Sequence, residues 1–156
     1  MQPLTHGEGQ DLLERFKQAW ERRDPDLAME LYREDAEHRD HPFREPFRGA
    51  NEIRAMWNDI VLNEAHVEFD AERTWVNGST VLASYHAAYT DRTTGERVRM
   101  RGFMTIEVDG EGHVSRLREW PTTQVVGMDT TLRPDRQPGL AGDEPIDPNR
   151  RRTHGR

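Results

Sequence analysis

The sequence predicts an α+β fold in which three amino-terminal helices pack on an antiparallel sheet. Apolar residues recur at helical spacing in three separate segments of residues 11–62, and at every second position through much of residues 67–120. The strand-like segments follow one another with no helical segment between them, as antiparallel strands joined by turns do. Such a sheet buries one face, and the helices are the elements available to cover it.

Three helices are expected in the first half of the chain. The first covers residues 11–23. Asp24 and Pro25 then suit the N-cap and the first helical position of a second helix, whose apolar stripe runs to Tyr32. A third stripe predicts a helix over residues 49–62. The charged stretch DAEHRDHPFREPFRG between the second and third stripes is consistent with an ordinary polar loop or with the rim of a site.

The second half of the chain has the pattern of a strand meander. Asn77-Gly78 is a strong hairpin signal, and the polar DGEG segment 109–112 marks another turn. The expected strands cover residues 67–75, 81–89, 98–108 and 114–120.

A single domain is expected over residues 10–127, preceded by a short segment 1–9. Residues 128–156 contain no aromatic residue, hold four of the nine prolines and are rich in arginine. They show neither helical nor strand periodicity, so we expect a largely disordered tail.

Charge and composition narrow the classes of partner. The net charge is −7, and because the tail carries a small positive excess, the body of the chain is more acidic than the whole. Nucleic-acid binding needs an excess of Lys and Arg on one face, so no nucleic-acid partner is expected. The sequence offers no long apolar span and no signal-peptide pattern, and cysteine is absent. We therefore expect a cytoplasmic protein with no membrane partner.

Four features together carry a resemblance to a known family. These are the Asp-Pro turn between two helices, the Asp35-Ala36 pair that opens a short strand, the segment FRGANEIRAMW, and the final strand GHVSRLREW. Over roughly residues 10–124 the chain resembles the nuclear transport factor 2-like superfamily, and more narrowly its SnoaL-like polyketide cyclase and ketosteroid isomerase branch. The resemblance implies a cone-shaped fold with a strongly curved sheet, an internal pocket and a homodimer formed through the outer sheet face.

The same resemblance selects candidate catalytic residues. The pattern DAEHRD places Asp40 where the isomerases carry the carboxylate that moves a proton, and Glu119 stands where SnoaL-like cyclases use a carboxylate on the last strand. Tyr85 is expected on the pocket face as a hydroxyl donor, and His38 shares a strand face with Asp40. Two carboxylates in a dry pocket can take the roles of acid and base, because burial and mutual repulsion separate their pKa values.

The walls of the pocket are expected to be apolar. Phe16 and Met104 fall where the steroid isomerases carry the two donors of their oxyanion hole. Neither side chain can donate a hydrogen bond to an enolate, so steroid isomerisation itself is not expected. The residues expected to contact a ligand are Phe16, Trp20, Trp57, Met100, Met104, Leu117 and Trp120.

Two functions of different classes remain open at this point. One is a cofactor-free acid–base enzyme of cyclase, isomerase, dehydratase or hydrolase type that acts on a small, mostly apolar molecule. The other is a non-catalytic module for small-molecule binding or dimerisation, with Asp40 and Glu119 as structural residues. His38, Asp40 and His41 also raise a metal alternative, but a site needs further ligands and no metal motif follows, so no metal is expected.

Overall fold

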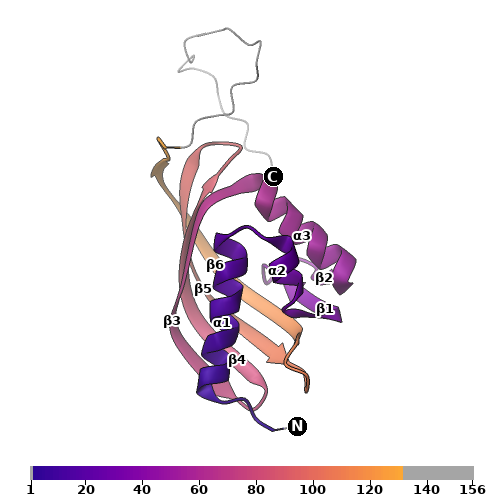
Figure 1. Cartoon of the computed structure of the whole chain (residues 1–156). Helices are drawn as coiled ribbons and strands as arrows, with labels where there is room; N and C mark the ends of the chain where they lie inside the picture. Colours follow the sequence, from indigo (N-terminus) through magenta and orange to yellow (C-terminus); the bar gives the residue numbers. More distant parts are fainter. Residues whose placement is uncertain (1, 132–156) are drawn as a thin grey trace, which may run out of the picture.

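The computed structural model describes residues 2–131, and its architecture confirms the predicted α+β fold (Figure 1). The elements in chain order are α1 (His6–Glu21), α2 (Pro25–Met29), β1 (Tyr32–Arg39), β2 (Phe47–Arg48), α3 (Gly49–Asn63), β3 (Glu64–Asn77), β4 (Thr80–Asp91), β5 (Glu96–Val108) and β6 (Val114–Met128). No helix within these residues is long and apolar enough to span a bilayer.

The strands form one six-stranded sheet in the order β2-β1-β6-β5-β4-β3. All neighbours are antiparallel except β1 and β6, which run parallel. The long strands β3 to β6 curve around α1, and the helices lie along the concave face (Figure 1). That face and the helices share one apolar core, which includes Phe16, Ile53, Trp57, Phe69 and Met104.

Side-chain caps define the first residues of α1 and α2. Thr5 and Glu8 form a reciprocal capping box, so α1 starts five residues before the expected position, in a polar turn that carries no apolar stripe. Asp24 caps α2 and Pro25 occupies its first turn, as the sequence indicates. The expectation that the second stripe is helical through Tyr32 is wrong, because Tyr32 begins β1 and pairs with Val114 of β6.

The last strand is longer than its apolar alternation suggests. It continues past Pro121 and pairs with β5 as far as Met128. The side chain of Asp129 then accepts hydrogen bonds from Thr90 and His66, which fastens this end of the strand to the sheet. Residues 128–131 therefore belong to the sheet and its last turn, and the remainder of the predicted tail, residues 132–156, lies outside the described residues.

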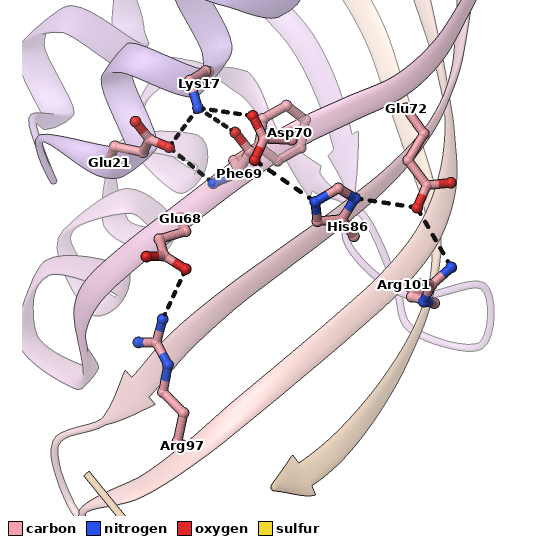
Figure 2. Close-up of polar contacts among 9 residues, drawn as sticks. All are labelled: Lys17, Glu21, Glu68, Phe69, Asp70, Glu72, His86, Arg97 and Arg101. Atoms are coloured by element: carbon pink, nitrogen blue, oxygen red, sulfur yellow. Dashed lines mark hydrogen bonds and ion pairs between the residues drawn. The ribbon is translucent and has the colours of Figure 1, made fainter. Parts of the chain in front are cut away.

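A polar seam fixes α1 on the edge strand β3 (Figure 2). The Lys17 amine donates to Glu21 at 2.8 Å, to the Phe69 carbonyl at 2.6 Å and to Asp70 at 3.2 Å, and Glu21 in turn accepts from the Phe69 backbone N–H. His86 of β4 lies between Asp70 and Glu72 of β3. Because this seam sets the position of α1 along the sheet, it also places Phe16 and Trp20 over the concave face.

Candidate active site

The concave face and the helices enclose a cavity of about 610 Å³. Aromatic and aliphatic side chains from α1, α3 and β5 form most of its apolar wall, and ionisable groups from β1, β3 and β6 reach into it. Its principal lining residues are Phe16, Trp20, His38, Asp40, Trp57, Ile60, Glu64, Tyr89, Met100 and Glu119.

The parallel pairing of β1 with β6 brings the candidate residues together. His38 pairs with Leu117 and Arg39 with Arg118, and alternate residues of a strand point to opposite faces. His38 and Glu119 therefore turn toward the helices, and Asp40, which follows the last pair, lines the same cavity. If the inward and outward alternation along β1 and β6 were displaced by one residue, all three side chains would face away from the cavity.

A chain of buried hydrogen bonds ends at the Glu119 carboxylate. The Tyr85 hydroxyl donates to Oε1 of Glu119 at 3.0 Å, and Nε2 of His38 lies 2.8 Å from Oε2. On its other side, Nδ1 of His38 lies 2.8 Å from the Tyr32 hydroxyl, which accepts from the Trp57 indole N–H at 3.3 Å. Each residue of this chain is at least nine-tenths buried.

The order of these bonds assigns the protons. The Glu119 carboxylate only accepts, so the single ring proton of a neutral His38 is assigned to Nε2, and the Tyr32 hydroxyl, which receives the Trp57 N–H, donates to Nδ1. Nδ1 is then an acceptor, and Nε2 carries the ring proton that it donates to Glu119. Glu119 thus receives two hydrogen bonds, which fix both of its oxygens and suit an ionised carboxylate.

Burial keeps the two tyrosines in their hydroxyl form. Loss of solvation raises the pKa of Tyr85 well above its usual range, and the charge and hydrogen bond of Glu119 raise it further. Desolvation likewise raises the pKa of Tyr32 far above its ordinary value, although its hydrogen bond with Trp57 works in the opposite direction. Both tyrosines therefore remain hydrogen-bond donors over the working range of proteins.

Asp40 is the more open of the two predicted carboxylates. Its side chain is 31% exposed, against 11% for Glu119. Oδ2 of Asp40 lies 3.6 Å from an Arg44 nitrogen, whereas Oδ1 has no hydrogen-bond partner among the residues that the structure describes. An unpaired, shielded carboxylate oxygen at a cavity wall is available to a ligand.

This arrangement agrees with the match of the chain to known proteins. Residues 13–117 match the model of the SnoaL-like domain. The chain belongs to the SnoaL-like domain family. No curated protein sequence matches it.

Solved structures share the fold of this SnoaL-like chain at low sequence identity. SalBIII, described as an epoxide hydrolase/cyclase-like enzyme in pyran ring formation in the polyether salinomycin, is 17% identical with a TM-score of 0.69, over 76% of this chain and 96% of that one. An epoxide hydrolase of Mycobacterium tuberculosis, described as LEH-like, is 19% identical with a TM-score of 0.64, over 75% and 84% of the two chains. RV0760c from the same organism is 12% identical with a TM-score of 0.67, over 78% and 99%.

Three of the residues expected to contact a ligand do not line the cavity of this SnoaL-like domain. Met104 and Leu117 are buried in the core, at 0% and 1% exposure. Trp120 follows Glu119 along β6, so strand alternation turns it to the outer face, where it is 43% exposed and faces the Phe103 ring. Phe16, Trp20, Trp57 and Met100 do line the cavity, and Tyr85 reaches it through Glu119.

Sequence reasoning missed two polar residues of the site. The apolar stripe predicts Tyr32 at the end of a helix, whereas the residue begins β1 and its hydroxyl lies against His38. Glu64 was placed before the first long strand, but β3 begins at this residue, and its Oε1 accepts from the Trp20 indole N–H at 2.8 Å inside the cavity. The pairing of β3 with β4 is irregular between Ala65 and Glu68, which interrupts the alternation that would have revealed Glu64.

The ionisation of Glu64 differs from that of an ordinary glutamate. Burial raises the pKa of Glu64 to about 7, and the negative charges of Glu119 and Asp91 act in the same direction, while the Trp20 hydrogen bond opposes the shift.

The histidines of the charged stretch are occupied by other contacts. Both ring nitrogens of His38 lie against Tyr32 and Glu119, and Nδ1 of His41 accepts from the Phe43 backbone N–H. Within residues 2–131 no group of three or more His, Asp or Glu side chains is arranged to hold a metal ion.

Proposed function

We propose that the protein is a cofactor-free acid–base enzyme that acts on a small, mostly apolar molecule in this cavity. The observation that carries the proposal is the Glu119 carboxylate, which is held by Tyr85 and His38 at a cavity that is also lined by aromatic side chains of α1 and α3. A structural carboxylate in a core is usually paired with a cation, whereas Glu119 is held by a phenol and an imidazole.

In this proposal Glu119 is the general base. It accepts a proton from a substrate carbon or from a water molecule in the cavity, and the two hydrogen bonds hold its oxygens in place during the transfer. The chain from Trp57 through Tyr32 to His38 keeps the imidazole in the tautomer that donates to Glu119. Tyr32 and Trp57 are thus positioning residues.

Asp40 is proposed as the partner acid. Its unpaired Oδ1 lies at the wall of the same cavity, where a protonated carboxyl could deliver a proton to a developing alkoxide. One group that takes a proton and one that returns it suit ring closure, isomerisation, dehydration, or addition of water to an epoxide. The family and the structural similarity to proteins described as epoxide hydrolase or cyclase-like support this range of reactions.

Steroid isomerisation is outside the proposed range. Phe16 lines the cavity without a donor group, and the side chain of Met104 is buried in the core. The loss of one oxyanion-hole donor typically costs about 2.7–4 kcal/mol of barrier, so the absence of both is a large handicap for enolate chemistry.

The test separates this enzyme from a non-catalytic binding module. Purified protein is incubated with small epoxides, beginning with styrene oxide, and diol formation is followed by chromatography for the wild type, Glu119→Gln, Asp40→Asn and the surface control Glu68→Gln. An enzyme loses at least about 100-fold in turnover in the first two variants and keeps it in the control. If Glu119→Gln changes the affinity for a ligand but leaves every rate at the background level of the wild type, the protein is a binding module.

The homodimer and the cytoplasmic location remain part of the proposal. A row of aromatic rings, Trp75, Phe103 and Trp120, crosses the outer face of the sheet with neighbouring centroids 6.2 and 6.4 Å apart. Aromatic residues are enriched at protein interfaces, and these rings are partly exposed on the outer sheet face. We propose that a second copy of the chain covers this row.

A further inference from the structure

The cavity contains a third carboxyl group that the proposed acid–base chemistry does not use. Glu64 lies at the junction of α3 and β3, and its Oε1 accepts the indole N–H of Trp20 at 2.8 Å. The Glu64 side chain forms no ion pair within residues 2–131, in contrast to Glu21 or Asp70 on the nearby polar seam. Its other carboxyl oxygen makes no hydrogen bond within the described residues, and the residue lines the cavity.

The groups around Glu64 favour its neutral form. Asp91 of β4 is its partner in the sheet register, and the negative charge of Glu119 of β6 acts on it through the cavity. The Arg23 guanidinium donates to the main-chain carbonyls of Val61 and Glu64 at 3.1 and 2.6 Å, and not to the Glu64 carboxylate. Burial between two acids without a cation on the carboxylate disfavours ionisation.

The remaining charged and titratable groups of the lining do not stabilise the ionised form of Glu64. Tyr89 of β4 stays a hydroxyl, because burial raises its pKa to about 12 and Glu64 contributes to that shift. Asp59 of α3 adds a further acid to the cavity lining, and Asp40 stands on the β1 side with His38 and His41. Arg44 is the lining cation, and its ion-pair partner at the rim is Asp40.

We propose that the carboxylic acid form of Glu64 donates a hydrogen bond to an oxygen atom of the ligand, so that the cavity selects uncharged molecules with a carbonyl, ether or epoxide oxygen. The proposal rests on the cavity of the proposed function and adds its substrate class. Trp20 occupies Oε1 of Glu64 with its N–H, so the acidic proton resides on Oε2 and has no acceptor within the described residues. A ligand oxygen would supply the missing acceptor.

The same arrangement disfavours anionic ligands. An anion beside Glu64 would meet the carboxylates of Asp59 and Glu119 at the walls of one cavity, and like charges repel at such short range. A hydrocarbon would fit the apolar walls but would leave the Glu64 proton without an acceptor, which costs affinity. A neutral ligand that carries an oxygen atom avoids the charge repulsion and also provides an acceptor for the Glu64 proton.

The binding test uses three probes with one ring skeleton: 2-acetylnaphthalene, 2-ethylnaphthalene and 2-naphthoate. Quenching of the fluorescence of Trp20 and Trp57, which line the cavity, reports binding at pH 5.5 and pH 8.5. We expect the ketone to bind roughly fivefold to tenfold more tightly at pH 5.5, the hydrocarbon to show no such change, and 2-naphthoate to bind weakly at both pH values.

Glu64→Gln is the matched variant. Its amide oxygen still accepts the Trp20 N–H and its NH₂ still donates, so it should bind the ketone well at both pH values and lose the pH dependence. Glu119→Gln removes one of the charges that disfavour ionised Glu64, so the pH dependence should persist with a lower midpoint. An unchanged pH dependence in Glu64→Gln would overturn the proposal, as would a ketone affinity independent of pH in the wild type.

A second measurement does not depend on any ligand. The Trp20 indole N–H resonance should titrate with a midpoint near the pKa of Glu64, about 7, and should stop doing so in Glu64→Gln. The Trp57 indole N–H, which donates to Tyr32, is the internal reference. A Trp20 resonance that does not move between pH 5.5 and 8.5 would mean that Glu64 keeps one charge state, and the proposal would fail. Turnover by wild type and Glu119→Gln tests the catalytic proposal separately, so the two failures are distinguishable.

Discussion

Gly102 of β5 lies directly opposite Tyr85 of β4, and the Tyr85 ring crosses the space that a side chain at position 102 would fill. A Cβ built on Gly102 would come within 2.6 Å of the Tyr85 hydroxyl oxygen, and within 2.6 and 2.9 Å of two ring carbons. The absence of a side chain there lets the ring lie flat on the sheet and its hydroxyl reach Glu119 at 3.0 Å. A glycine inside a strand thus positions the donor of the proposed base.

Gly102→Ala should displace the Tyr85 ring and weaken its bond to Glu119. Because Tyr85 is 1% exposed, the ring has little room to move, and we expect a loss of about 1–3 kcal/mol in the free energy of unfolding. Urea unfolding measures that loss, and turnover should fall as far as it does in Tyr85→Phe. Gly7→Ala is the control, since a Cβ at Gly7 meets only the Thr5 hydroxyl oxygen at 3.9 Å. Equal stability of the Gly102 and Gly7 variants would contradict the close approach.

Tyr32→Phe should disturb His38 without changing the shape of the core. The substitution removes the donor to Nδ1 of His38 and the acceptor of the Trp57 indole N–H, both in a buried setting. Unsatisfied buried groups of this kind cost about 1–3 kcal/mol. Nitrogen-15 NMR of the imidazole should also show a shifted Nδ1 resonance, because Nδ1 loses its hydrogen-bond donor while Nε2 keeps its proton against Glu119. Tyr89→Phe is the control, because the Tyr89 hydroxyl makes no hydrogen bond within residues 2–131, and this variant should leave the His38 signals unchanged.

Glu64 should make the folded protein lose stability as the pH rises. The pKa of Glu64 is raised from 4.5 to about 7 on folding, so between these values the folded state holds a proton that the unfolded state has released. The stabilisation is complete below pH 4.5 and disappears as the pH passes through 7. One pKa unit corresponds to about 1.4 kcal/mol, and partial exposure reduces the total to about 2 kcal/mol.

The comparison with Glu64→Gln isolates this contribution. Urea unfolding at several pH values should give a smaller decline for the variant between pH 4.5 and 7, because the histidines titrate in both proteins and cancel in the difference. Parallel stability curves for wild type and variant would show that Glu64 has the same pKa in both states of the chain.

The sequence predicted the fold well because its signals are local. Helix caps such as Asp24-Pro25 and turns such as Asn77-Gly78 are defined by neighbouring residues. The placement of Glu119 on the concave side came from the family resemblance, and the structure places it at the cavity. The strand ends were less predictable. The final part of β6 is held by pairing with β5 and by Asp129, which are contacts between distant segments.

The site was predicted only in part because its polar network is not local. His38 and Glu119 are 81 residues apart, and no periodicity shows that they share a hydrogen bond. Trp120 is among the residues expected in the pocket, but it follows Glu119 on β6 and strand alternation turns it to the other face. Glu64 gave no sequence signal, since its environment comes from Trp20, Asp91 and Glu119, which belong to three other elements.

The outer aromatic row provides the last prediction, which concerns the homodimer. If a second copy covers Trp75, Phe103 and Trp120, then Trp120→Arg places an unpaired charge in a buried contact and should shift the protein toward the monomer. Light scattering after gel filtration measures the mass over a range of concentrations. Leu62→Arg is the control, because Leu62 is 68% exposed on α3, away from the outer sheet face. A wild type that is monomeric at high concentration would refute the homodimer, and a dimer unaffected by Trp120→Arg would mean that another surface forms it.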